Sequence, residues 1–318
     1  MTDRETVFGD MAILIPVRSD PRILDCIESI DIKGVELVIA LNDPTAEIRM
    51  ICERLESATI VVVAEPGIGG ALAAAVEATK RRYLVLTDSD CLFDRGALGH
   101  LADALVSGAE IARGDVIYDT GNSWTGRLIA EARRSNHDGR VNGYSPLLVI
   151  DRRVIPAIGG YLFSSGLPFR EDRELDFRLQ LAGKVVVPTK ASVRHAPQHG
   201  VVDLRSAFRY GRGERIGRRM GLFAKPSWSW VIRDAGRTLV WYARECSWSV
   251  TAYLGVWTSI FWCGLLLPVA GERRQPRAPF RVAEGVPMWS TELPAKYAIA
   301  LRHQHATMGR TIGSDSGQ

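Results

Sequence analysis

Apolar residues in the first 90 positions fall into short continuous runs, and the segments between these runs carry apolar residues at helical spacing. The runs predict strands at residues 11–17, 35–41, 59–64 and 83–87. The helical segments are residues 21–30, 47–55 and 67–82. Strands that are apolar throughout and alternate with helices are typical of βαβ units, so we expect an α/β fold with a mostly parallel sheet and helices on both faces. Sheets of this kind bind ligands at the carboxyl ends of their strands.

The pattern changes after residue 201, where charged and apolar residues separate into blocks. Six arginines lie within residues 205–219, whereas residues 246–271 form a run of 26 positions without a charge. As a single helix this run would be about 39 Å long, which is enough to cross a bilayer core. It predicts a C-terminal hydrophobic helical extension that spans a membrane, lies on one, or packs as buried helices, and the arginines at 205–219 would add attraction to anionic headgroups. The polar residues 302–318 predict a disordered tail.

Composition narrows the class of protein and its partners. The chain has 318 residues, of which 46% are hydrophobic and 24% charged, as in ordinary globular proteins of one or two domains. Lys and Arg outnumber Asp and Glu by only 40 to 36, so we expect no nucleic-acid partner. The five cysteines form no C-x-x-C pair, and the first ten residues are charged. We therefore expect reduced thiols, no secretion signal, and a cytoplasmic protein that is free or bound to the cytoplasmic face of a membrane.

The strongest chemical motif is Asp88-Ser89-Asp90, which directly follows the predicted strand at residues 83–87. Two carboxylates one residue apart at the end of a buried strand point toward the ligand cleft, and Mg²⁺ or Mn²⁺ is bound well by carboxylates together with substrate phosphates. The alternative is a turn with solvated aspartates, because D-x-D is a common tripeptide. The strand in front of the motif favours the metal site.

A second acidic group occupies residues 171–176, where Leu175 and Leu179 predict a helix that begins near Asp172. Acidic residues in a first helical turn complement the helix dipole, which accounts for two or three of these carboxylates. The functional interpretation makes one of them a general base that points into the cleft. Composition alone favours the dipole.

Two further segments carry candidate site residues. His195 follows the strand predicted at residues 184–188 and is a candidate metal ligand, although a lone histidine is more often structural. The glycine-rich segment that begins at Gly67 joins the third strand to a helix, where backbone N–H groups favour a phosphate. A tight strand-to-helix turn explains these glycines equally well, and the segment does not match the G-x-G-x-x-G fingerprint.

Taken in order, these segments resemble family 2 glycosyltransferases with the GT-A fold, over roughly residues 11–220. The matching segments are residues 13–17, 37–43, 88–90, 158–161, 171–172, 194–195 and 209–215. The sequence departs from the family where Asn42 replaces a frequent aspartate and where residues 71–73 lack a frequent arginine.

The resemblance implies a metal-dependent enzyme that moves a sugar from a nucleotide-diphosphate donor, with a UDP-sugar favoured, to a hydroxyl acceptor with inversion. Asp90, Asp88 and His195 would hold Mn²⁺ or Mg²⁺. Asp172 would be the catalytic base with Glu171 as its neighbour. The donor would be bound by Pro16, Asp43, Gly67, Asp88 and Asp90.

The resemblance implies a nucleotide-sugar-binding catalytic domain at residues 1–220, and the change in composition adds the helical hydrophobic region at 221–301 and the tail at 302–318. The acceptor is a sugar or small molecule, or a lipid-linked molecule if the protein binds a membrane. A nucleotidyltransferase is one alternative, but that class has a glycine-rich loop after the first strand, where residues 18–21 contain no glycine. A catalytically silent membrane-associated scaffold is the other.

Overall fold

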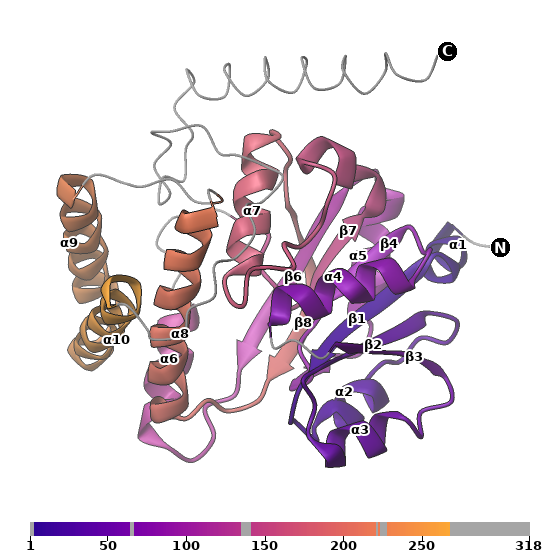
Figure 1. The fold of residues 1–318 in the computed structure, drawn as a ribbon, viewed down its shortest axis with the longest axis horizontal. Coiled ribbons are helices and arrows are strands. Elements are labelled where there is room, and N and C mark those ends of the chain that lie inside the picture. The colour runs from indigo at the N-terminus through magenta and orange to yellow at the C-terminus, as the bar shows by residue number, and fades with distance from the viewer. Residues whose placement is uncertain (1–2, 64–66, 135–140, 221, 223–227, 268–318) are drawn as a thin grey trace.

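The computed structural model describes residues 3–63, 67–134, 141–220, 222 and 228–267 of the chain (Figure 1). The predicted tail at residues 302–318 lies outside the described residues, as do residues 268–271 of the uncharged run.

Eight strands form one sheet in the described part of the chain, in the order β3-β2-β1-β4-β7-β6-β8-β5. The strands are β1 Met11–Val17, β2 Glu36–Asn42, β3 Ala58–Val63, β4 Tyr83–Leu86, β5 Cys91–Phe93, β6 Ile111–Tyr118, β7 Leu148–Asp151 and β8 Val187–His195. The helices before residue 200 are α1 Asp3–Gly9, α2 Ile23–Glu28, α3 Ala46–Cys52, α4 Ile68–Ala78, α5 Ala97–Val106, α6 Trp124–Arg134, the 3₁₀ helix η1 Arg152–Ile158 and α7 Glu171–Leu181.

The first half of the sheet is parallel, as the sequence predicts. Strand β1 pairs in parallel with β2 and β4, and β2 pairs in parallel with β3. Strand β7 then enters between β4 and β6 and is antiparallel to both, while β6 and β8 are parallel. The sheet is therefore mixed but mostly parallel, and its four consecutive parallel strands are the four predicted from apolar runs.

Helices cover both faces of the sheet, which confirms the predicted layers. On one face, alternate residues of β1 such as Ile13 pack with Ile23 of α2 and Leu98 of α5. On the other face, Leu14 packs with residues of α4 and with Leu175 of α7. Because consecutive β1 side chains enter opposite clusters, the strand is buried along its whole length.

Strand β8 corrects one sequence-based boundary. The sequence predicts a strand at residues 184–188, whereas β8 begins at Val187 and continues to His195. Gly183 and Lys184 instead close the end of α7, because their N–H groups bond to carbonyls of Gln180 and Leu179. The strand thereby ends on the candidate metal ligand.

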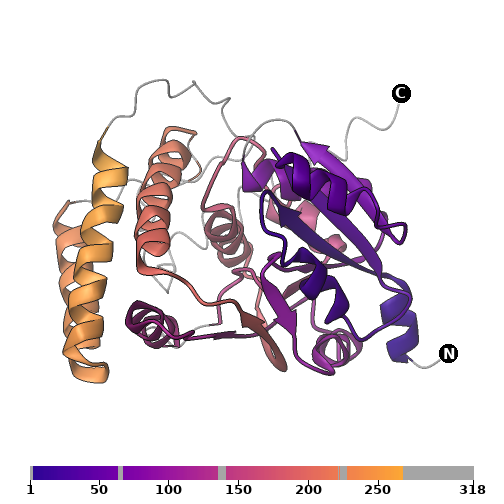
Figure 2. The ribbon, with the colours of Figure 1, turned by 90° about the horizontal axis from the view of Figure 1, so that it is seen from below.

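Three helices follow the sheet: α8 Gly200–Met220, α9 Trp228–Glu245 and α10 Trp248–Leu266. The uncharged run is therefore not one helix, because Cys246 still bonds to α9 and the Ser247 hydroxyl caps α10 by accepting from the Val250 N–H. Figure 2 shows α9 and α10 as the outermost layer, on the side of α8 away from the sheet. Among the described helices, α10 alone is long and apolar enough to cross a membrane, and 22% of it is buried inside the structure.

Two glycines bring α8 and α10 into backbone contact. A Cβ at Gly264 would lie 2.2 Å from the Phe208 carbonyl oxygen, and a Cβ at Gly211 would lie 2.0 Å from the Phe261 carbonyl oxygen. The contact buries Ala207, Phe261 and Leu265. Helix α10 is therefore packed onto the helix that ends at the predicted domain boundary.

We expect Gly264→Ala to lower the free energy of unfolding by about 1–3 kcal/mol, because the added methyl group forces the two helices apart. Urea unfolding of the full chain measures the change. Gly255→Ala on the same helix is the control, because nothing lies within 4 Å of its Cβ position, and alanine favours the helix there by up to about 1 kcal/mol. Equal effects of the two substitutions would contradict the packed contact.

Candidate active site

The Asp88-Ser89-Asp90 motif lies where β4 ends, and strand pairing brings His195 to it. Strand β5 starts directly after the motif and pairs antiparallel with β8, which places Cys91 opposite His195. The Ala196 N–H donates to the Asp90 carbonyl oxygen at 3.1 Å. Backbone hydrogen bonds thus hold together two segments that are far apart in sequence.

The structure brings together all three predicted metal ligands. One ligand atom from each of Asp88, Asp90, Cys91 and His195 lies within 4.8 Å of the others. His195 Nε2 is 3.6 Å from an Asp90 carboxylate oxygen, while its Nδ1 is 2.8 Å from the Ala196 carbonyl oxygen. When Nδ1–H donates to that carbonyl, the Nε2 lone pair faces the carboxylates, which is the arrangement of a metal-binding histidine. The ring of Tyr118 stacks on the imidazole at 5.0 Å and fixes its orientation.

The chemistry of these donors fits a hard divalent cation. Burial, followed by the charges of Asp88 and Asp90, raises the pKa of the Cys91 thiol well above its usual range, so this sulfur stays protonated and is a poor ligand. Burial and the charge of Asp90 raise the pKa of Asp88 to about 6, as expected where two carboxylates face each other. Two carboxylates and one imidazole suit Mn²⁺, and the carboxylates suit Mg²⁺.

The carboxylates at the start of α7 divide into structural and available groups. Glu174 forms a fully buried ion pair with Arg178, at 2.6 Å, and accepts from the Tyr161 hydroxyl at 2.8 Å. Asp176 accepts from the Gly143 N–H at 2.7 Å. Arg178 also donates to the carbonyls of residues 158, 161 and 162, so this network holds the loop before α7. Of the acidic group, Glu171 and Asp172 are left for chemistry.

We expect Glu174→Gln to lower the free energy of unfolding by about 2 kcal/mol, because Arg178 loses its charged partner but keeps an acceptor. Catalytic turnover below the new melting temperature should keep the wild-type kcat. Thermal unfolding and initial rates measure the two effects. Loss of kcat without loss of stability would instead make Glu174 a candidate base.

The carboxyl groups of Glu171 and Asp172 interact electrostatically with Asp88 of the metal-ligand cluster. This cluster consists of Asp88, Asp90, Cys91 and His195. Burial raises the pKa of both carboxyl groups; the charge of Asp172 adds to the rise at Glu171, while Arg170 opposes the rise at both. The charge of Asp88 contributes to the pKa of Glu171, and that of Asp172 to the pKa of Asp88. A carboxylate with a raised pKa accepts a proton more readily near neutral pH.

Arg170 fixes where α7 begins. Its φ is 73°, in the left-handed region that a long side chain rarely adopts, so surrounding contacts must hold it there. Its guanidinium lies 3.8 Å from the fully buried carboxylate of Glu214 and 5.8 Å from the ring centroids of Tyr210 and Phe261. Helices α8 and α10 therefore help to position the two available carboxylates.

Three of the predicted donor-binding residues lie at separate places on or beside the sheet: Pro16, Asp43 and Gly67. Asp43 follows β2 and forms an exposed ion pair with Arg18 at 2.7 Å. Gly67 precedes α4, and its N–H donates to the Asn42 side-chain oxygen at 2.9 Å, so the Asn42 amide ties the end of β2 to the start of α4. Pro16 is buried within β1. None of these three belongs to the metal-ligand cluster.

The glycine-rich segment serves chain packing at one position. A Cβ at Gly69 would lie 2.5 Å from the Ser164 carbonyl oxygen and 2.6 Å from that of Leu167. It would also lie 3.5 Å from the Glu171 Cβ. Glycine is therefore required here so that the loop before α7 can cross the start of α4, which brings Glu171 toward the sheet edge.

Arg22 is a member of the site that none of the sequence motifs includes. Its guanidinium donates to Asp20 at 2.8 Å and lies 3.5 Å from the Asp90 carboxylate. The D-x-R spacing of Asp20 and Arg22, directly after the first strand, is the signal that could have indicated it. Arg22 supplies a partly exposed positive charge beside the metal ligands.

Residues 12–155 match the family model described as Glycosyl transferase family 2. This part of the chain is similar to glycosyl transferase family 2. The matched residues include Asp43, Asp88 and Asp90, whereas Asp172 and His195 lie beyond the match and are placed by the structure alone. No curated protein matches the sequence.

Solved structures that match the chain include those of S. aureus TarS. The crystal structure of S. aureus TarS 1-349 is 12% identical with a TM-score of 0.44, and the match covers 63% of this chain and 65% of that one. The same protein in complex with UDP-GlcNAc gives 12% identity, a TM-score of 0.47, and coverages of 63% and 66%. The chain thus spans just under two thirds of the length of the first of these structures.

Proposed function

We propose that the protein is a metal-dependent, inverting glycosyltransferase that uses a nucleotide-diphosphate sugar. The observation that carries the proposal is the convergence of Asp88, Asp90 and His195 at the carboxyl end of β4, with the available carboxylates of α7 facing them. The family match of residues 12–155 supports the transfer of a sugar from a nucleotide donor.

Asp88, Asp90 and His195 would hold the divalent cation, with the His195 tautomer set by the Ala196 carbonyl. The chemistry that such a cation would supply is Lewis acidity toward the diphosphate leaving group. Arg22 supplies a further positive charge at the same place. A positive charge beside the leaving group would favour its departure.

Asp172 would take the proton from the acceptor hydroxyl, which is a poor nucleophile without a base. Asp172 is half-buried, which weakens the solvation of its carboxylate, and the Arg173 N–H, which donates at 2.6 Å, fixes one of its oxygens. Attack from the side opposite the leaving group inverts the anomeric carbon. Glu171 is buried beside it, and the charge of Asp172 helps to raise the pKa of Glu171.

We expect a UDP-sugar as donor and a sugar, small-molecule or lipid-linked hydroxyl as acceptor. We also expect a cytoplasmic location, and five free cysteine thiols support that setting.

The test is a thermal-shift screen of nucleoside diphosphates on the full chain, with and without Mn²⁺. We expect one diphosphate to raise Tm when Mn²⁺ is present, and the base that does so identifies the donor. Hydrolysis of the matching nucleotide sugar in the presence of Mn²⁺ then separates an enzyme from a silent scaffold. If no diphosphate shifts Tm with Mn²⁺, the proposed function is wrong.

A further inference from the structure

The outer layer formed by α9 and α10 exposes apolar side chains that the catalytic site does not use. Ile232 is 72% exposed, Trp248 77%, Val256 50% and Leu266 54%. In both views the two helices lie away from the sheet, beyond α8 (Figures 1 and 2). Soluble monomers rarely leave large apolar side chains exposed together in this way.

Helix α9 combines an apolar line with an arginine line on its exposed side. Ile232, Gly236 and Val240 are four residues apart and follow one face of the helix, and all three are exposed. Arg233, Arg237 and Arg244 are exposed on the adjoining face. An apolar face bordered by arginines is typical of a helix that lies in the headgroup region of an anionic membrane.

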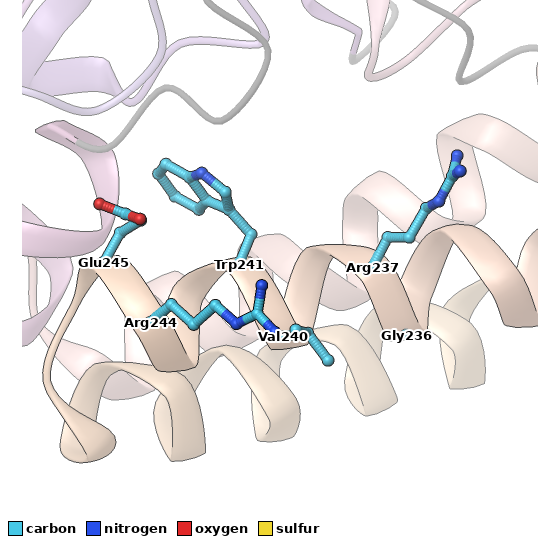
Figure 3. A pocket seen from close by; sticks show the side chains of 6 residues that line it. All are labelled: Gly236, Arg237, Val240, Trp241, Arg244 and Glu245. Atoms are coloured by element: carbon cyan, nitrogen blue, oxygen red, sulfur yellow. The ribbon is translucent and has the colours of Figure 1, made fainter.

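A shallow groove of about 390 Å³ lies along the C-terminal half of α9. Arg237, Trp241 and Arg244 line it together with Gly236, Val240 and Glu245. Figure 3 shows the Trp241 ring standing between the carboxylate of Glu245 and the guanidinium of Arg237. Arginines and a tryptophan along one groove suit a lipid phosphate, because arginine forks bind phosphate and tryptophan favours the interface.

Helix α10 carries a second exposed apolar face, which has no charge. Its exposed side chains include Trp248, Ala252, Val256, Cys263 and Leu266, which share one face of the helix. A core helix of a soluble protein would be mostly buried, whereas only 22% of α10 is. The outer face of α10 is therefore suited to contact acyl chains while the arginines of α9 contact headgroups.

The opposite face of α10 prevents it from crossing a bilayer in this packing. Tyr253 donates to the buried Asp203 carboxylate at 2.6 Å, and Asp203 pairs with Arg133 at 2.8 Å. Together with the Gly211–Gly264 contact, these interactions hold α10 against charged groups of α6 and α8. Crossing the membrane would break this network or carry its charges into lipid.

We propose that the outer faces of α9 and α10 form a peripheral docking surface for a membrane with anionic headgroups, with α10 lying along the membrane. Charge complementarity identifies the occupant, because exposed arginines beside apolar residues match headgroups above acyl chains. The arginines within residues 205–219 contribute less than the sequence indicates, because Arg215 is 7% exposed and Arg218 pairs with buried Glu214.

The test is flotation of the full chain with two kinds of vesicle: phosphatidylcholine alone, and phosphatidylcholine mixed with phosphatidylglycerol. We expect the chain to float with the anionic vesicles at low salt and to be released at high salt. Each arginine near the surface strengthens binding about fivefold, so Arg233→Glu/Arg237→Glu/Arg244→Glu should weaken it by about 100-fold or more.

The matched control is Arg49→Glu/Arg54→Glu/Arg95→Glu, which makes the same change of net charge at exposed positions far from α9 and α10. It should float like the wild type. If both triple variants weakened vesicle binding equally, net charge alone would explain the binding, and the proposal would be overturned. So would a full chain that stays in solution with anionic vesicles at low salt.

A separate experiment measures whether α10 faces the membrane. It uses Cys263, which is exposed on α10. A polarity-sensitive dye on Cys263 in a Cys246→Ser background should shift to the blue on anionic vesicles. The same dye on Arg49→Cys, in a Cys246→Ser/Cys263→Ser background, should not shift. Equal shifts at the two positions would overturn the assignment of α10 to the membrane-facing side.

Retention of the chain in vesicles after alkaline carbonate extraction would show that α10 spans, and would overturn the peripheral arrangement. A dimer in solution that Val256→Asp converts to a monomer, without vesicle binding, would show a second copy on this surface and would also overturn the proposal.

Discussion

Asp90→Ala should abolish metal-dependent nucleotide binding and lower sugar transfer by at least about 10³-fold, because a Lewis acid stabilises a departing diphosphate by several kcal/mol. The fold should survive, since the Asp90 carboxylate makes a long contact with Arg22 and a 3.6 Å contact with His195 at a partly exposed place. Removal of such a pair costs about 0–1 kcal/mol. Titration of the nucleoside diphosphate with and without Mn²⁺ measures the loss.

The matched control is Asp94→Ala, the same change four residues along. Asp94 accepts from the Ser192 hydroxyl at 2.6 Å and pairs with Arg194 at 2.9 Å, so it supports the β5–β8 pairing without joining the metal ligands. Its variant should bind the nucleotide as the wild type does in Mn²⁺. An Mn²⁺-dependent affinity that survives in Asp90→Ala would remove this residue from the metal site.

The part of the fold that the sequence predicts is the part that local pattern determines. Strands β1 to β4 are short apolar runs between helices, and the D-x-D motif follows the last of them, so both could be found without distant contacts. Strand β7 could not be placed, because its antiparallel position between β4 and β6 depends on pairing partners far away in sequence. The same holds for the β5–β8 register that carries His195 to Asp90.

The candidate site shows a similar division. The sequence places Glu171, Asp172 and Glu174 in one first turn, where all three complement the helix dipole equally well. Their tertiary partners decide which of them are structural and which are available. Glu174 is structural because it pairs with Arg178 and accepts a hydrogen bond from Tyr161. The spacing of four between Glu174 and Arg178 indicates such a pair, but only burial shows that Arg178 also holds the loop before the helix.

The arrangement of the C-terminal region could not be predicted for a different reason. Its apolar length is visible in the sequence, but a spanning helix, an interfacial helix and a packed helix share that property. The distinction depends on contacts on one face of α10, where Gly264 meets α8 and Tyr253 reaches Asp203. Those contacts couple the extension to Arg170, and through it to the start of α7.

Asp172→Asn should keep the affinity for donor and metal yet lower kcat by about 10²-fold or more, because it preserves shape and removes the proton acceptor. The Arg173 N–H can still donate to the side-chain amide oxygen that this substitution introduces, so α7 should begin at the same place. Initial rates at saturating donor, together with nucleotide binding in Mn²⁺, separate the catalytic loss from a binding loss.

Asp176→Asn on the same helix controls for damage to α7, since it makes the same chemical change at a buried carboxylate that accepts from the Gly143 N–H and from Gln180. We expect it to lose stability while it keeps kcat, the reverse of Asp172→Asn. Glu171→Gln completes the set. If Glu171 were the base, Glu171→Gln would lose kcat and Asp172→Asn would keep it. Near-normal transfer by Asp172→Asn together with a large loss in Glu171→Gln would move the proton acceptor to Glu171 and leave Asp172 as the group that raises its pKa.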